Sequence, residues 1–211
     1  GRQDETDGPH LIYAPEVPFD IDKYVEDVDR IYSREGRCLI AVSEGIHDAA
    51  GTPIAIKLAE LQGHHVERDA HGNPQLSGTG ALGDFLSQEL KNRLSDKHGK
   101  LRVRADTFGY MQRCFAGCVS KTDQVEAREA GRKAAEVALM GNVDGSIAIV
   151  RTSDDPYRVE YKMISLGEVA AKTRHLPEDY IVDGNNIAES YRRYLEPIVG
   201  PLPTVELLRS H

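Results

Sequence analysis

Two arginines and a tyrosine lie close together around a glycine between residues 104 and 113. Arg104 lies near the end of a run that alternates apolar and charged residues, Gly109 and Tyr110 follow it, and Arg113 comes shortly after the tyrosine. An arginine side chain carries a permanent charge and a planar fork of donors, which suits the oxygens of a phosphate dianion. The segment is therefore predicted to bind a phosphate group.

The charge around this segment contrasts with the charge of the whole chain. The 211 residues carry a formal net charge of −8, yet residues 91–104 contain six lysines and arginines and one aspartate. A positive region on an acidic protein concentrates small anions, whereas nucleic-acid-binding domains are usually basic as a whole. We therefore expect a small phosphorylated ligand and no nucleic acid. The lysines are expected to solvate a helix face, while Arg104 and Arg113 flank the turn.

A carboxylate, Glu44, follows another predicted strand, which spans residues 38–42. In open α/β sheets, ligands bind beyond the carboxyl ends of the strands. A carboxylate at the end of one strand and an arginine at the end of another suit a sugar phosphate, with Glu44 accepting hydrogen bonds from hydroxyls and Arg113 binding phosphate oxygens. By its position alone, Glu44 is also compatible with a solvated loop carboxylate or a cap on the next helix.

The elements that must position these residues begin with a strand, a helix and a second strand. Residues 10–14 form a short apolar run, the apolar residues of 21–35 recur at helical spacing, and residues 38–42 are continuously apolar. A strand, a helix and a strand in this order predict a βαβ unit with parallel strands. The continuous apolar pattern of the second strand predicts that it is covered on both faces.

Further helices and strands alternate along the rest of the chain. Helices are predicted from the spacing of apolar residues and from their caps, and strands from alternating or continuous apolar runs. Asn186 and Glu189 form a capping box that predicts the start of the last helix. The remaining predicted elements are helices at 82–94 and 122–140, strands at 101–107, 146–150 and 158–166, and a last helix from 186 to 195. The fold class is therefore α/β, with a mainly parallel sheet flanked by helices.

Composition and the start of the chain indicate the cellular compartment and the extent of the protein. The three cysteines lack the spacing of a zinc site, which favours a reduced, cytoplasmic protein. No apolar run is long enough to cross a bilayer. Residues 62–80 are polar and rich in glycine and histidine, and are predicted to form a loop or excursion. Because the chain starts without methionine and with a polar stretch, we expect residues 1–211 to be one portion of a longer protein.

Two patterns in the polar region resemble known binding sites. Residues 78–83 match the Gly-x-Gly-x-x-Gly pattern of dinucleotide-binding loops. That motif requires a buried strand before it, and residues 71–77 are polar and contain a proline, so a turn that opens a helix is the favoured interpretation. His64, His65 and His71 have no second spaced pair of ligands, and they are interpreted as solvated histidines without a metal.

Four short motifs are spread over the chain. They are Leu-Ile-Tyr-Ala-Pro-Glu at 11–16, Ala-Val-Ser-Glu-Gly at 41–45, Gln-Leu-Ser-Gly at 75–78 and Gly-Tyr-Met-Gln-Arg at 109–113. Together they resemble the 6-phosphofructokinase family, in particular its pyrophosphate-dependent branch, and the similarity covers nearly the whole chain. The resemblance implies a phosphofructokinase-like fold and phosphoryl transfer to the 1-hydroxyl of fructose 6-phosphate, which gives fructose 1,6-bisphosphate in glycolysis. It also implies Mg²⁺ as cofactor, pyrophosphate or ATP as donor, and a homo-oligomer without nucleic-acid or membrane partners.

Carried over position by position, the resemblance implies a binding site for fructose 6-phosphate. Glu44 would bind the sugar hydroxyls, Arg113 the 6-phosphate, and Arg104 the 6-phosphate held by a neighbouring subunit. Tyr110 stands where ATP-dependent members usually have histidine, which favours pyrophosphate as the donor. The full set of implied substrate-binding residues is Glu44, Arg104, Tyr110, Met111, Gln112 and Arg113.

The chain also departs from the family pattern. It contains no Gly-Gly-Asp segment and none of the glycine-rich phosphate loops that, in the family, accompany the catalytic base and the magnesium contact. It therefore resembles the C-terminal, acceptor-binding half, with no catalytic residues and no metal ligands, and alone it is expected to be inactive. Two alternatives stay open at this point: a non-catalytic sugar-phosphate sensor, and a dinucleotide-binding oxidoreductase domain built on residues 78–83.

Overall fold

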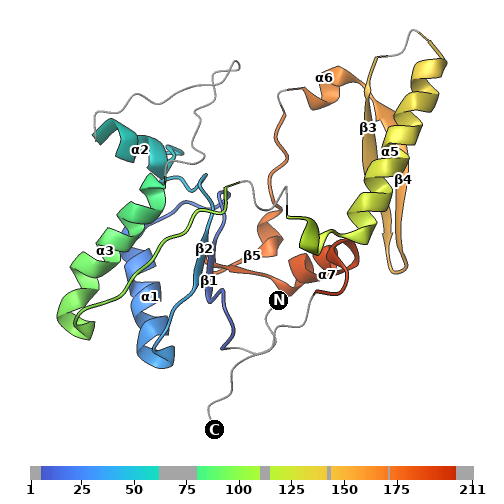
Figure 1. Cartoon of the computed structure of the whole chain (residues 1–211). Helices are drawn as coiled ribbons and strands as arrows, with labels where there is room; N and C mark the ends of the chain where they lie inside the picture. The colour runs from blue at the N-terminus through green and yellow to red at the C-terminus, as the bar shows by residue number, and fades with distance from the viewer. Residues whose placement is uncertain (1–5, 62–79, 110–114, 142–143, 171, 203–211) are drawn as a thin grey trace. The chain divides into compact units, whose positions relative to one another are not determined.

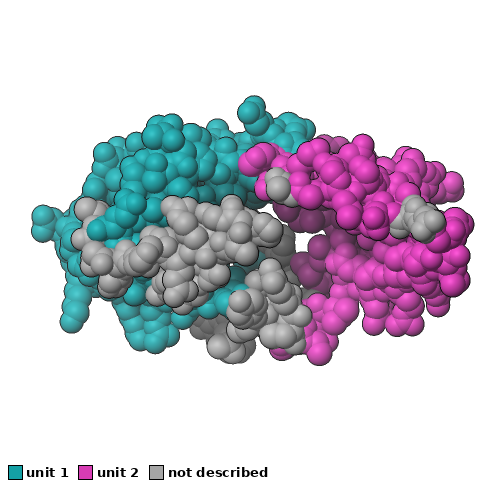
Figure 2. Space-filling model, turned by 90° about the horizontal axis from the view of Figure 1, so that it is seen from above, with its two compact units in different colours: residues 1–114, 177–188 teal, residues 115–176, 189–211 magenta. Residues whose placement is uncertain are grey.

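The computed structural model describes residues 6–61, 80–109, 115–141, 144–170 and 172–202. The chain divides into two compact units, which Figure 2 shows in different colours. Unit 1 consists of Gly1–Cys114 and Pro177–Ala188, and unit 2 consists of Phe115–Leu176 and Glu189–His211. The C-terminal part of the chain therefore contributes to both units.

Unit 1 begins with the strand, helix and strand that the sequence predicts (Figure 1). Strand β1, Leu11–Tyr13, pairs in parallel with strand β2, Ile40–Val42, and helix α1, Ile21–Glu35, connects them. α1 begins where the Asp20 side chain accepts two backbone hydrogen bonds, and it ends at Gly36, whose φ of 67° suits a residue without Cβ. The predicted βαβ unit is confirmed.

The core of unit 1 forms where β1 and the helices bury their apolar faces. Helix α3, Ala81–His98, packs against α1 and against helix α2, Ile54–Leu61. α3 confirms a predicted helix, whereas α2 is an addition to the predicted elements. The buried side chains of this core are Leu11, Tyr13, Phe19, Tyr24, Val25, Val28, Ile31, Ile46, Leu58, Leu82, Leu86, Leu90 and Leu94.

Polar contacts also join α1 to the last turn of α3. The Asp29 carboxylate accepts hydrogen bonds from Lys97 Nζ and from His98 Nε2, each at 2.5 Å. The hydrogen bond from Lys97, followed by the one from His98, holds the pKa of Asp29 below its usual range. The His98 ring also packs edge-on against the Tyr32 ring, with 5.1 Å between the ring centroids. These contacts fix the ends of the two helices to each other.

The segment 101–107 is not the strand that the sequence predicts. Leu101 and Val103 pack, partly buried, against the core. Arg102 and Arg104 are exposed, so the alternating pattern does sort the side chains as predicted. The segment nevertheless takes no part in the strand pairs of the described residues. Alternation determines which side chains face the core, whereas a strand also needs a neighbour for its backbone groups.

β2 is less buried than its sequence predicts. The side chain of Leu39, just before the strand, is 59% exposed, and Ala41 is exposed as well. The alternate residues Cys38, Ile40 and Val42 pack, partly buried, against the core. In the described part of the chain, the prediction that this strand is covered on both faces is therefore wrong.

Unit 2 contains a helix that packs on a β-hairpin. Helix α5, Lys121–Leu139, contacts strand β3, Ser146–Asp154, and strand β4, Tyr157–Ile164. α5 confirms the predicted helix and Ser120 caps it. Both predicted strands are present, but they pair antiparallel. Only two residues separate β3 from β4, and a parallel connection needs a crossover of about a dozen residues or more.

Short elements complete both units. In unit 2 these are the 3₁₀ helix η1, Ala116–Cys118, and the helices α6, Leu166–Val169, and α7, Glu189–Val199. In unit 1 they are the 3₁₀ helix η2, Glu178–Tyr180, and the antiparallel strands β5, Ile181–Val182, and β6, Asn186–Ile187.

The predicted capping box at the start of the last helix is wrong. Asn186 lies in β6, where its Oδ1 accepts a hydrogen bond from the backbone N–H of Ile187 at 2.9 Å. α7 begins only at Glu189. Asparagine side chains bond nearby backbone groups in strands and turns as well as at helix ends. Here the Asn186 side chain bonds a backbone group of β6.

The predicted α/β class is confirmed, and β1 and β2 form a parallel pair beside helices. Two further strand pairs are antiparallel, one in each unit. Among the described residues, no helix is both long enough and apolar enough to span a bilayer. The parallel pair of unit 1 is the part of this fold that bears on the predicted site.

Candidate functional site

The carboxyl ends of β1 and β2 lie next to each other in unit 1. Tyr13, at the end of β1, is in register with Val42, at the end of β2. The backbone N–H of Ser43 donates a hydrogen bond to the carbonyl of Tyr13 at 3.0 Å. Glu44 therefore directly follows the point at which the parallel pair ends, which is the edge where open α/β sheets bind ligands.

The turn that carries Glu44 is held on both sides. The backbone N–H of Gly45 donates to Ser43 Oγ at 3.2 Å, and that of Ile46 donates to the Ser43 carbonyl at 3.3 Å. Ile46 is fully buried, and a Cβ added at Gly45 would lie 3.2 Å from Cβ of Pro15. The turn thus packs closely on the chain that leaves β1. Glu44 itself is partly buried.

A buried carboxylate fixes the end of β1. Asp27, on α1, is 7% exposed and accepts hydrogen bonds from the Tyr13 hydroxyl at 3.1 Å and from Asn185 Nδ2 at 2.5 Å. Its other oxygen accepts from Arg30 at 2.7 Å. Burial alone would raise the pKa of Asp27, but the hydrogen bonds from Arg30, Asn185 and Tyr13 outweigh it and hold this pKa below its usual range. Burial, followed by the Asp27 charge, raises the pKa of Tyr13.

Sequence reasoning missed this network. Tyr13 and Asp27 are 14 residues apart, and Asn185 is 158 residues from Asp27. One signal was present in the sequence. Asp27 lies on the same helical face as Tyr24, Val28 and the other apolar residues of α1, and a charged residue on a core-facing stripe requires a buried partner.

Arg104 lies in the extended segment after α3. Its side chain is exposed. A Cβ added at Gly83, in the first turn of α3, would lie 2.8 Å from Cβ of Ala105, so the backbone around Arg104 lies closely against that helix. Figure 1 shows this segment rising toward the end of the sheet at which β1 and β2 finish. The other implied substrate residues, Tyr110, Met111, Gln112 and Arg113, lie outside the described residues.

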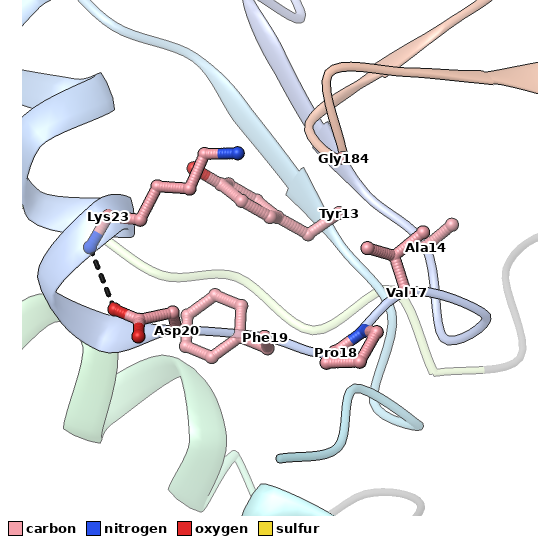
Figure 3. A pocket seen from close by; sticks show the side chains of 8 residues that line it. All are labelled: Tyr13, Ala14, Val17, Pro18, Phe19, Asp20, Lys23 and Gly184. Atoms are coloured by element: carbon pink, nitrogen blue, oxygen red, sulfur yellow. Dashed lines mark hydrogen bonds between the residues drawn. The ribbon is translucent and has the colours of Figure 1, made fainter. Parts of the chain in front are cut away.

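A small hollow lies beside the end of β1. Figure 3 shows the ring of Tyr13 and the side chain of Lys23 on its wall, together with Phe19 and Gly184. Lys23 Nζ donates a hydrogen bond to the Asp183 carbonyl at 2.9 Å. The hollow offers about 30 Å³, which is room for only a few water molecules. It is too small for a sugar phosphate, so we assign it no substrate.

The glycine pattern at 78–83 falls partly within the described residues. Gly80 has a φ of 67° and immediately precedes α3, which agrees with a turn that opens a helix. Residues 62–79, with the rest of the predicted loop and with His64, His65 and His71, lie outside the described residues. Among the described side chains, no three histidines, cysteines or acids converge as a metal site would require.

Comparison with known proteins identifies the family. Residues 6–169 match the family model described as Phosphofructokinase. The chain belongs to the phosphofructokinase family. A pyrophosphate–fructose 6-phosphate 1-phosphotransferase of Rhodospirillum rubrum is 52% identical over 213 residues, which cover 100% of this chain and 50% of that phosphofructokinase relative. A relative of the same name from Halomonas elongata is 35% identical over 219 residues, with coverages of 99% and 48%.

A solved structure agrees with the family assignment. The crystal structure of a pyrophosphate-dependent phosphofructokinase from Marinobacter aquaeolei matches this chain with a TM-score of 0.71 and 26% identity, over 98% of this chain and 44% of that one. The chain thus spans about half the length of the curated relatives it matches. The matched residues 6–169 include the glycines at 78–83, so the family match spans the pattern on which the dinucleotide-binding alternative was built.

Proposed function

We propose that the chain supplies the fructose 6-phosphate site of a pyrophosphate-dependent phosphofructokinase. The observation that carries the proposal is its 52% identity, over its full length, to the Rhodospirillum rubrum enzyme. In the proposed reaction, O1 of fructose 6-phosphate attacks one phosphorus atom of pyrophosphate. The bridging P–O bond breaks, inorganic phosphate leaves, and the proton of O1 passes to a base outside this chain. The product is fructose 1,6-bisphosphate.

The proposed role of Glu44 is to accept hydrogen bonds from the sugar hydroxyls. Its turn follows β2 directly and is held by hydrogen bonds at Ser43 and by the buried Ile46, which limits the positions that the carboxylate can take. Holding a binding group in a fixed geometry favours substrate binding. This arrangement supports the role that the family resemblance implies.

The proposed phosphate contacts come from the segment after α3. Arg113 binds the 6-phosphate, with Tyr110, Met111 and Gln112 beside the same substrate. Arg104 reaches the 6-phosphate bound by a neighbouring subunit, which makes the proposed active form a homo-oligomer. The exposure of Arg104 supports this role, because a guanidinium that is to bind an anion from another subunit must be accessible.

The proposed donor site, catalytic base and Mg²⁺ contact belong to a part of the enzyme other than this chain. Phosphoryl transfer depends mainly on positioning and on neutralising the charge of the transferred group. Without those parts, residues 1–211 alone bind fructose 6-phosphate weakly and do not turn it over. Formation of fructose 1,6-bisphosphate by the isolated chain, in the presence of pyrophosphate and Mg²⁺, would contradict this part of the proposal.

A titration of the isotopically labelled chain with fructose 6-phosphate, followed by amide NMR, tests the site. Shifts are expected at Glu44, Tyr110 and Arg113, and an Arg113→Ala variant should lose them. Arg102→Ala is the matched control, since Arg102 is an exposed arginine two residues before Arg104. This variant should show the same amide shifts as the unaltered chain. If both variants lose the shifts to the same extent, only the general positive charge attracts the ligand.

A further inference from the structure

The hydrogen bonds of Asp27 join three segments of unit 1 that are distant in sequence. Asp27 comes from α1, Tyr13 from β1, and Asn185 from the turn between β5 and β6. The backbone carbonyl of Asn185 also accepts a hydrogen bond from the N–H of Ile12 at 2.8 Å. The carboxyl end of β1 is therefore held by α1 through a side chain and by the Asn185 segment through the backbone.

A continuous series of contacts leads from Asp27 to the Glu44 turn. Asp27 fixes the hydroxyl of Tyr13, and the carbonyl of Tyr13 accepts the N–H of Ser43. Ser43 Oγ in turn accepts the N–H of Gly45. Glu44 lies between these two residues. A displacement of Tyr13 must therefore move or release the backbone on both sides of Glu44.

The acceptor at the start of this series is a strong one. Hydrogen bonds to an ionised carboxylate are stronger than those between neutral groups, and Asp27 is almost excluded from water. A donor that loses this partner in the protein interior is left unsatisfied, at a greater cost than the bond itself contributes. The network therefore favours a single position of Tyr13.

We propose that Asp27, acting through Tyr13, is a positioning residue that holds the Glu44 turn in its substrate-binding position. The role of Glu44 in this inference rests on the proposed function. Asp27 itself is buried on α1, and it acts on the substrate only through the intervening residues.

Tyr13→Phe is the decisive variant, because it removes only the hydroxyl that bonds Asp27. In the full 211-residue chain we expect the amides of Ser43 and Gly45 to exchange with deuterium about tenfold faster. We expect the dissociation constant for fructose 6-phosphate to rise about three- to tenfold. Amides in the middle of α3, such as that of Leu90, should exchange as before.

Tyr24→Phe is the matched control. Tyr24 is 2% exposed and its ring centroid lies 5.5 Å from that of Tyr13, but it is not a donor to Asp27. This variant should leave the Ser43 and Gly45 amides and the affinity unchanged. Asp27→Leu removes the acceptor itself and should have a larger effect than Tyr13→Phe; should it fail to fold, the comparison of the two tyrosine variants still decides the question.

Each outcome has a defined meaning. Faster exchange confined to Ser43 and Gly45, with weaker binding, supports the positioning role of Asp27. Equal acceleration in α3 would show that the network only stabilises the fold, and unchanged exchange would show that Tyr13 does not hold the turn; either result overturns the proposal. If the unaltered chain binds no fructose 6-phosphate but the exchange pattern is as expected, the proposed function fails while the positioning of the turn stands.

Discussion

Truncation of Ile46 is expected to destabilise unit 1 strongly, because this side chain anchors the turn that carries Glu44. Ile46 is 0% exposed, and its carbonyl accepts a hydrogen bond from the N–H of Ile54 at 3.0 Å. Ile46→Ala removes the side chain beyond Cβ and leaves a cavity, for which typical losses are about 2–5 kcal/mol. Since no part of the side chain reaches solvent, we expect the free energy of unfolding to fall by about 3–4 kcal/mol. Ile46→Val should lower it by about 1 kcal/mol.

Urea denaturation followed by circular dichroism measures these losses. Leu39→Ala is the control, because the Leu39 side chain is 59% exposed and its truncation should lower the free energy of unfolding by less than about 1 kcal/mol. Ile46→Ala should also weaken binding of fructose 6-phosphate under conditions in which the variant is folded. Similar losses for Ile46→Ala and Leu39→Ala would refute the reasoning, since they would show that burial at the turn does not stabilise the unit.

Three further predictions concern glycines, pH and unit 2. Gly36→Ala should lower the free energy of unfolding by about 1 kcal/mol, because Gly36 has a φ of 67° at the end of α1. Gly131→Ala should raise it by about 0.5–1 kcal/mol, because Gly131 lies inside α5 and a Cβ added there meets open space. Thermal unfolding of the two variants tests whether the signs are opposite. The pKa of Asp29 is lower in the folded than in the unfolded chain, so its contribution to stability is present above the ordinary carboxyl range near pH 4 and is lost as pH falls below it. The free energy of unfolding of Asp29→Asn should therefore fall less than that of the unaltered chain between about pH 5 and pH 3. Urea denaturation at several pH values measures this, and an equal fall in the two proteins would contradict the prediction. Tyr157→Phe removes a 2.7 Å hydrogen bond to the buried Glu126 carboxylate and should lower the free energy of unfolding by about 1–3 kcal/mol, and an unchanged melting temperature would count against that bond.

The features that follow from local rules could be predicted from the sequence. The apolar residues of 21–35 recur at helical spacing and predicted α1, because this pattern acts within a few residues along the chain. The position of Glu44 beyond a parallel strand followed from the βαβ pattern, since the carboxyl ends of parallel strands share one edge.

Features that depend on distant neighbours could not be predicted in this way. The alternation of residues 101–107 predicted which side chains face the core, but no local pattern says whether a neighbouring strand is present. Asn186 and Glu189 have the spacing of a capping box, yet Asn186 lies in β6 and pairs with β5. The bond between Asp27 and Asn185 spans 158 residues, and only the burial of a charged group on α1 pointed to it.

Binding of fructose 6-phosphate to the isolated chain, measured by calorimetric titration beside fructose as ligand, tests the central claim most directly. The acceptor site proposed for Glu44 and Arg113 predicts saturable binding of the phosphate ester at about millimolar affinity. It also predicts a loss of about tenfold or more in Arg113→Ala, and no detectable binding of fructose, which lacks the phosphate. Equal responses to the two sugars, or no response to fructose 6-phosphate from a folded chain, would contradict the claim that this chain carries the acceptor site.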